Sequence, residues 1–392
     1  MEGSPSVSGS APATTPSVVA PTLSAEEVTR LTARANEAFD REDFVSCLAA
    51  RTQLLAAALE RPEATLQEKV DAHIALARVY ATSAHHFKEM SKQFQEAVEL
   101  ASRVNDVPVI AKTLTRLAYT LFRALQPDAA LTQFQNAIQL AQTIREQDKG
   151  ESYFYALIEF GRAVLNINAK GGQEKAAKAL VEAVEGTREA LGEYSELHAM
   201  ALVALGEAKK AAEDFDGCID LIERALTAKK LAPLDQARAL TFLGAAYSEK
   251  ENQAQKSLEC FSEAIAIRRG VFANGEEHMM VAEVYLDVAA EHHELGNHLK
   301  TVEALEKCIP YLSLNDNVVD AQFAWLRKAL EAAQLSEDEA QERYRRVKQT
   351  RRAAQAAKTR LPAPAKDKAA VANSFLPAVK VPPKKKQGGK KK

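Results

Sequence analysis

The chain lacks the sequence features of membrane, secreted and metal-binding proteins. Its 392 residues contain no run of about eighteen consecutive apolar residues, so no membrane insertion is expected. The four cysteines form no C-x-x-C pair, which indicates packing thiols suited to a reducing compartment. The first residues, MEGSPSVSGSAPATTPSVVAP, have neither a basic start nor an apolar core and therefore do not resemble a secretory signal. Together these absences favour a cytoplasmic protein.

Motifs for catalysis are also missing. The sequence has no G-x-x-x-x-G-K-[ST], no G-x-G-x-x-G after a strand and no G-x-S-x-G. The richest histidine cluster is EHHELGNH, but His293 and His298 are five residues apart and Gly296 breaks the helix between them. A zinc-peptidase helix needs two histidines on one face, so we interpret these as surface histidines at a helix end. We therefore expect no enzyme, no cofactor and no metal site.

β-Structure is not indicated either, because alternating β-branched runs do not recur and aromatic residues make up only 6% of the chain. What does recur is the pattern of Leu205 to Ala225, in which a small residue on one helix precedes a turn and a second helix carrying Cys218 and Ile222. The interval between equivalent small residues ranges from 38 to 45 residues. These small positions are Ala35, Ala77, Ala118, Gly161, Gly206, Gly244 and Ala289. Such regular internal repetition predicts stacked helical hairpins.

This pattern resembles the tetratricopeptide repeat family, most closely at Leu243-Gly244-x-x-Tyr247 with Phe261 and Ala264. The period near 42 residues, with LGEYSELH and GEEHMMVA entering two first helices, is similar to the longer repeats of kinesin light chains. The resemblance implies an all-α, right-handed superhelical solenoid of about seven hairpins plus C-terminal capping helices. It also implies a scaffold or adaptor that binds a partner peptide in its concave groove.

Four regions follow from this pattern. Residues 1–23 are rich in Ser, Pro, Ala and Thr and are predicted to be disordered. Residues 24–335 form the solenoid, which begins at a capping box of Ser24 and Glu27 and ends in a capping helix with Trp325. A basic C-terminal helix is predicted over 336–360, and a disordered Lys/Pro/Ala-rich tail over 361–392.

Charge divides the chain sharply. From Arg343 onward there are 17 Lys or Arg and one acid, whereas the first 342 residues hold 34 basic and 52 acidic residues. The tail is therefore a candidate polyanion-binding segment. Its strongest candidates are Lys384, Lys385, Lys386, Lys390, Lys391 and Lys392. Tubulin tails, RNA, an anionic membrane, an import receptor and the chain's own acidic array all remain possible partners at this stage.

The resemblance also implies which side chains line the groove, because positions around each small residue on the first helix point inward. Over repeats two to four these positions are basic and aromatic, which favours a partner segment with acidic residues and an apolar anchor. The groove candidates are Arg78, Lys112, Arg116, Tyr119, Arg123, Tyr155, Arg162 and Asn166.

Related repeat proteins grip acidic chaperone tails with a carboxylate clamp of Lys, Asn and Arg. Asn36, Lys112 and Arg116 match that clamp, whereas Thr32 and Ala75 stand where a lysine and an asparagine are expected. A chaperone co-factor with a degenerate clamp is therefore one alternative. An RNA-associated or nuclear repeat protein is another, and microtubule-linked transport or cilium or flagellum assembly is the preferred setting. The partner's identity and the oligomeric state are left open.

Overall fold

The structure is a computed structural model that describes residues 23–123, 126–167, 172–312 and 316–362. Within these ranges it contains sixteen α-helices and no β-strand, so the predicted all-α repeat solenoid is confirmed. The predicted disordered segment 1–23 lies almost wholly outside the described residues. The six tail lysines also lie outside them, and their role stays a prediction.

Fourteen of the helices pair into seven consecutive hairpins. Their first helices are α1 (Ala25–Asp40), α3 (Leu66–Tyr80), α5 (Val107–Arg123), α7 (Glu151–Ile167), α9 (Glu196–Ala211), α11 (Pro233–Ser248) and α13 (Met279–Glu294). Their second helices are α2 (Phe44–Glu60), α4 (Phe87–Arg103), α6 (Pro127–Gln142), α8 (Gly172–Leu191), α10 (Phe215–Thr227), α12 (Ala254–Val271) and α14 (His298–Cys308). Two short 3-10 turns (Ala84–His86 and Gly275–Glu277) precede α4 and α13, and α15 (Asp316–Ala332) and α16 (Glu337–Ala357) follow the hairpins.

The helix starts follow local sequence rules. Ser24 and Glu27 form the predicted capping box, in which the Ser24 amide donates to Glu27 Oε2 at 2.8 Å. Ser336 caps α16 by accepting a hydrogen bond from the Glu339 amide at 3.3 Å. Pro127 and Pro233 open α6 and α11, where a missing N–H costs nothing. These local signals mark where α1, α6, α11 and α16 begin.

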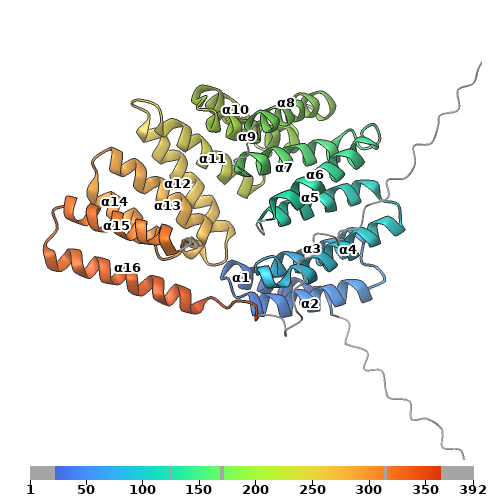
Figure 1. Cartoon of the computed structure of the whole chain (residues 1–392), viewed down its shortest axis with the longest axis horizontal. Coiled ribbons are helices and arrows are strands. Elements are labelled where there is room, and N and C mark those ends of the chain that lie inside the picture. The colour runs from blue at the N-terminus through green and yellow to red at the C-terminus, as the bar shows by residue number, and fades with distance from the viewer. Residues whose placement is uncertain (1–22, 124–125, 168–171, 313–315, 363–392) are drawn as a thin grey trace, which may run out of the picture.

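Each hairpin packs on its neighbours, and the array curves as it stacks (Figure 1). The first helices α3, α5, α7, α9, α11 and α13 contact one another along the row, which places them on the concave side. Because one hairpin cannot bury both of its faces, the apolar core runs continuously from repeat to repeat.

The small residue of each hairpin is buried, and where it is glycine it faces a large side chain on the second helix. A Cβ built on Gly161 would lie 2.6 Å from Leu180 Cγ, and one on Gly206 would lie 2.7 Å from Ile222 Cγ1. These approaches are closer than any real Cβ makes, so the large side chain occupies the space that the small residue leaves. The periodic small residues in the sequence are therefore packing positions.

Helix α16 packs on the end of the array through some of its arginines. Arg343 donates one hydrogen bond to each carboxylate oxygen of Glu306, both at 2.8 Å. Arg351 donates to the carbonyls of Ile309 at 2.9 Å and Leu312 at 3.0 Å, where α14 ends. A cation at a helix C-terminus interacts favourably with the helix dipole, so Arg351 stabilises the end of α14.

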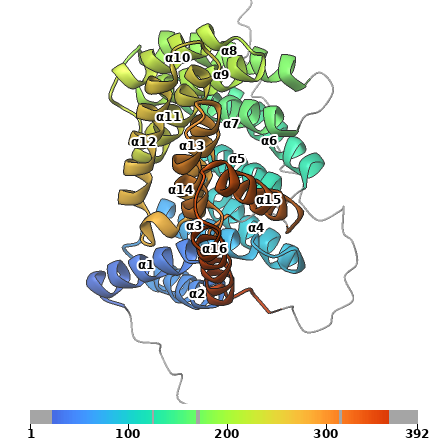
Figure 2. The same cartoon turned by 90° about the vertical axis from the view of Figure 1, so that its left-hand side faces the viewer.

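The chain then returns to its beginning, so that the array closes into a ring (Figures 1 and 2). Helix α16 ends at Ala357, and Thr359 forms an isolated β-bridge with Asp43 between α1 and α2. A second contact joins the loop after α12 to α1, where Asn274 Nδ2 donates to the Asp40 carbonyl at 3.1 Å. Leu361, which was expected to start a disordered tail, is only 7% exposed.

Replacing glycine by alanine tests the packing role. We expect Gly206→Ala to lower the free energy of unfolding by about 1–3 kcal/mol, because Ile222 must move to make room for the new Cβ. The higher helix propensity of alanine offsets up to about 1 kcal/mol of this loss. The matched control is Gly270→Ala on α12, where the added Cβ meets nothing within 4 Å. This control should gain up to about 1 kcal/mol. Urea unfolding followed by circular dichroism measures both, and equal effects would contradict the packing role.

Candidate functional site

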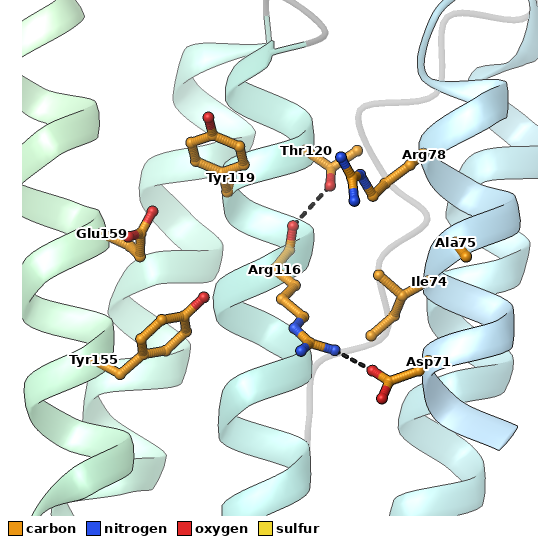
Figure 3. A pocket seen from close by; sticks show the side chains of 9 residues that line it. All are labelled: Asp71, Ile74, Ala75, Arg78, Arg116, Tyr119, Thr120, Tyr155 and Glu159. Carbon is orange, nitrogen blue, oxygen red and sulfur yellow. Dashed lines mark hydrogen bonds and ion pairs between the residues drawn. The ribbon is translucent and has the colours of Figure 1, made fainter. Parts of the chain in front are cut away.

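A pocket of about 420 Å³ opens between α3, α5 and α7 on the concave side of repeats two to four (Figure 3). Each helix contributes side chains spaced three or four residues apart, which therefore lie on one helix face. The lining residues are Asp71, Ile74, Ala75 and Arg78 of α3, Arg116, Tyr119 and Thr120 of α5, and Tyr155 and Glu159 of α7. Pockets of this volume admit a small ligand or a few side chains of a peptide.

Four of the eight predicted groove residues meet in this pocket: Arg78, Arg116, Tyr119 and Tyr155. Arg78 also lies over the Phe39 ring of α1, with 5.6 Å between its guanidinium carbon and the ring centroid. Tyr119 is one of the exposed large aromatic side chains of the array. Half of the predicted groove residues therefore line one concavity, and their role in partner binding stays a prediction.

Charges within the pocket are balanced. Arg116 forms an ion pair with Asp71, and the two side chains are 42% and 46% exposed. Burial, helped by the nearby Glu159 carboxylate, raises the pKa of Tyr155 to about 12, so its hydroxyl stays neutral at physiological pH. The pocket therefore contains two arginines, two carboxylates and two phenols. It is less basic than the sequence suggested.

The remaining predicted groove residues do not join the pocket. Lys112 lies on α5 with its Nζ 3.9 Å from Glu151 Oε2, outside the lining set. The side chains of Arg123 and Asn166 lie outside the described part of the structure. The clamp match is not an open set of ligands, since Arg116 is paired with Asp71 and Asn36 accepts a hydrogen bond from Arg51. The clamp stays a prediction.

Arg162 requires a correction, because it was expected to face the groove and is only 5% exposed. Its guanidinium lies 3.0 Å from Glu159 Oε1 and 3.7 Å from Glu207 Oε1. Asp235 lies 3.9 Å away on its other side. Carboxylates from three hairpins therefore surround the arginine. They neutralise its charge, so Arg162 does not present a cation to the groove.

Glu207 is the centre of this buried network. It is 4% exposed and accepts two hydrogen bonds from Arg238, at 2.6 Å from Nε and 2.7 Å from Nη2. Burial alone would lower the pKa of the Arg238 guanidinium, but the Glu207 carboxylate raises it above its usual value. The paired geometry matches the planar fork of arginine to a carboxylate. The network joins α7, α9 and α11 across their concave faces.

The sequence-based selection missed the acidic residues of the pocket. Asp71 stands six residues before the small Ala77, and Lys112 and Tyr155 stand six residues before Ala118 and Gly161. The same position rule therefore selects Asp71, and only the preference for basic side chains passed it over. Glu207 directly follows the small Gly206, as Arg78 and Arg162 follow Ala77 and Gly161, so the position rule selects it too and the same preference passed it over.

The described residues form neither a metal-binding cluster nor a membrane-spanning helix. In the ranges that the structure covers, no group of three or more His, Cys, Asp or Glu residues is placed to hold a metal ion. Among those same residues, no helix is both long and apolar enough to cross a membrane.

Two solved structures share part of this helical arrangement. BtubC (BKLC) from P. vanneervenii aligns with 58% of this chain and 92% of its own length, at 19% identity and a TM-score of 0.46. A P. anserina protein described as a kinesin light chain with nearly identical TPR-like repeats aligns with 53% of this chain and 97% of its own length. The identity is 20% and the TM-score is 0.40. No protein-family model and no curated protein matches the chain. Likenesses at this level carry no argument about partners, and the repeated-hairpin fold is established by the helices themselves.

Removing one partner of the buried network should be costly. We expect Glu207→Ala to lower the free energy of unfolding by about 3–5 kcal/mol, because Arg162 and Arg238 then lose their shared carboxylate. The control is Asp216→Ala, which breaks the exposed Asp216–Lys250 ion pair and should cost less than about 1 kcal/mol. Denaturant unfolding compares the two. A cost for Glu207→Ala as small as that of the control would show that the network is dispensable.

Proposed function

We propose that the chain is a non-catalytic scaffold that binds a partner segment in the pocket between α3, α5 and α7. The observation that carries this proposal is the convergence of Arg78, Arg116, Tyr119 and Tyr155 from three hairpins on one concave pocket. Convergent polar and aromatic groups in a concavity are typical of ligand sites.

The pocket chemistry favours a segment with an acidic residue beside an apolar one. The Arg116–Asp71 pair is exposed, and exposed pairs contribute only about 0–1 kcal/mol, so a partner carboxylate can replace Asp71 at little cost. Ile74 and Ala75 supply apolar surface on α3, and Tyr119 offers an aromatic face. Arg78 lies at the other end of the same α3 face and provides a second cation. An acidic, apolar peptide segment satisfies all of these groups.

A phage-displayed random peptide library tests this proposal without knowledge of the natural partner. We expect the wild-type chain to enrich peptides with Asp or Glu next to a large apolar residue, because Arg78 and Arg116 select the acid. Arg116→Glu should weaken binding of the enriched peptides at least tenfold. The matched control is Arg224→Glu on α10, which also sits in an exposed Arg–Asp pair but lies outside the pocket. Equal loss in both variants, or no enrichment, would contradict the pocket assignment.

A second surface supports binding of a polyanion through the C-terminal region. Arg345, Lys348 and Arg352 on α16 are exposed, and their spacing places them along one side of the helix. Within the described ranges none of the three forms an ion pair, in contrast to Arg343 and Arg346, which bind Glu306. This row of cations leads toward the lysine-rich residues after 362. Rigid and tail cations together provide an extended electrostatic surface.

Among polyanions we propose the acidic tails of tubulin, which is the partner that suits microtubule-linked transport or cilium or flagellum assembly. Binding of this kind is electrostatic and should weaken steeply with salt. The proposed location is accordingly cytoplasmic, with a cytoskeletal or ciliary association. An RNA-associated role is the alternative that the same surface permits.

Co-sedimentation with microtubules distinguishes these partners. We expect the chain to pellet with intact microtubules and to be released between 50 and 200 mM salt, about the range in which such contacts weaken most. Replacing Lys384, Lys385, Lys386, Lys390, Lys391 and Lys392 by Gln should reduce the pelleted fraction several-fold, because six positive charges are lost. Microtubules whose acidic tails have been removed by protease serve as the control. Undiminished pelleting on trimmed microtubules, or retention by RNA alone, would contradict the tubulin proposal.

A further inference from the structure

The turn between α1 and α2 holds an extended piece of chain from the other end of the protein. The amide of Phe44 opens α2, where no carbonyl of its own helix is available, and it donates to the Thr359 carbonyl at 3.1 Å. The amide of Thr359 donates in turn to the Glu42 carbonyl at 3.2 Å. Residues 358 onward have left the helix, since Lys358 has extended backbone angles. The pairing is therefore a short case of strand addition to an exposed backbone edge.

Side chains make the contact specific. Lys358 Nζ lies 2.6 Å from Glu42 Oε1, and both side chains are largely shielded from solvent. The Thr359 hydroxyl donates to Asp43 Oδ1, the carboxylate oxygen that also caps α2 by accepting from the Ser46 amide. A cation and a hydroxyl at successive positions are therefore both recognised.

Leu361 completes the docked segment by filling an apolar site formed by the first two hairpins. The buried members of this site are Ala38, Cys47 and Val79, and Phe39, Phe44, Leu48 and Tyr80 pack around them. Arg360, between Thr359 and Leu361, is exposed. The docked segment therefore binds through Lys358, Thr359 and Leu361 and leaves Arg360 in solvent.

The chain contains an internal comparison for this site. Glu213-Asp214-Phe215-x-x-Cys218 repeats the motif Glu42-Asp43-Phe44-x-x-Cys47 at the fifth hairpin. Its backbone is also similar, with a left-handed φ of 60° at Glu213 and 57° at Glu42.

The two turns differ along the preceding helix, and two of the differences change the apolar site. Lys209 and Lys210 stand where α1 has Ala38 and Phe39, so the apolar site for a leucine is missing. Lys209 Nζ lies 2.8 Å from Asp214 Oδ2 and uses the carboxylate that Thr359 binds at the first turn. The shared motif therefore makes only part of the site, and at the first turn Ala38 and Phe39 contribute to its apolar part.

We propose that the α1–α2 turn is a peptide-binding site for an extended segment of the form Lys-Thr-x-Leu, and that residues 358–361 occupy it as an internal ligand. The occupied site closes the solenoid into a ring by joining residues 316 positions apart in the sequence. The site is separate from the pocket between α3, α5 and α7, so this inference goes beyond the proposed function and does not depend on it.

A peptide added in trans tests whether the turn is an independent site. The full-length chain carrying Leu361→Asp should release its own segment, because a carboxylate cannot enter the apolar site. A fluorescein-labelled peptide of residues 355–364 should then bind this variant at least tenfold more tightly than wild type. In wild type the attached segment competes at a high effective concentration.

The control peptide carries the same Leu361→Asp change and should not bind. Fluorescence anisotropy measures both affinities, and circular dichroism checks that the variant keeps its helices. Absence of peptide binding to the variant, or equal binding of the two peptides, would overturn the site.

A charge exchange tests the cis contact in the intact protein. Lys358→Glu and Glu42→Lys should each accelerate hydrogen exchange at the amides of Phe44 and Thr359, and the double variant should restore protection. Lysine tolerates the left-handed backbone of position 42, as Lys149 and Lys229 have φ of 53° and 50°.

Arg360→Glu is the matched control, because it reverses a neighbouring exposed charge without touching the turn. Equal acceleration by this control, or no effect of the single changes, would contradict the assignment. Light scattering supplies the last check. A wild-type dimer that Leu361→Asp dissociates would mean that a second copy, and not the same chain, fills the site.

Discussion

The structure depends on how closely the two helices of each hairpin approach one another at a single small residue. At Gly161, Gly206 and Gly244 the facing Leu180, Ile222 and Phe261 fill the space that a Cβ would take. A buried small residue stands at the equivalent place in every hairpin, so neighbouring repeats stack in a similar way and the array curves. The curvature in turn decides that first helices face inward, which is what brings α3, α5 and α7 around one pocket.

Charge on the concave side is largely neutralised by the array itself. The first 342 residues carry a net negative charge, and Arg116, Arg162 and Arg238 each pair with an acid from a neighbouring hairpin. Arg162 and Arg238 share Glu207 in a buried network, whereas Arg116 meets Asp71 at an exposed position. The two situations differ energetically, since a buried pair resists exchange and an exposed pair does not. A partner carboxylate can therefore engage Arg116 at little cost, whereas Arg162 and Arg238 are held by Glu207.

The sequence predicted what local periodicity determines. The recurrence of small residues located the hairpins, and positions relative to them located Tyr119, Tyr155 and Arg78 on the concave side. It did not show that Arg162 is enclosed, because Glu207 and Asp235 lie one and two hairpins further along the chain. Nor could it show that Leu361 packs on the first hairpin, since composition at that point indicates only a polar tail. Non-local pairings of this kind depend on the curvature of the whole ring, which no single helix encodes.

The seam of the ring is weaker than the contacts that build the ring. It consists of two backbone hydrogen bonds, one ion pair, the Thr359 hydroxyl and one buried leucine, together with the contacts of Asp40 to residues 273 and 274. Burying Leu361 contributes about 2 kcal/mol, and each hydrogen bond adds about 1 kcal/mol. The hairpins, in contrast, share a continuous core in which dozens of apolar side chains are buried. The seam therefore belongs to the low-stability end of the structure, where local opening precedes unfolding, and it stays closed because its two partners belong to the same chain. A contact with these properties holds the concave surface in one shape and still allows exchange with an external segment of the same chemistry.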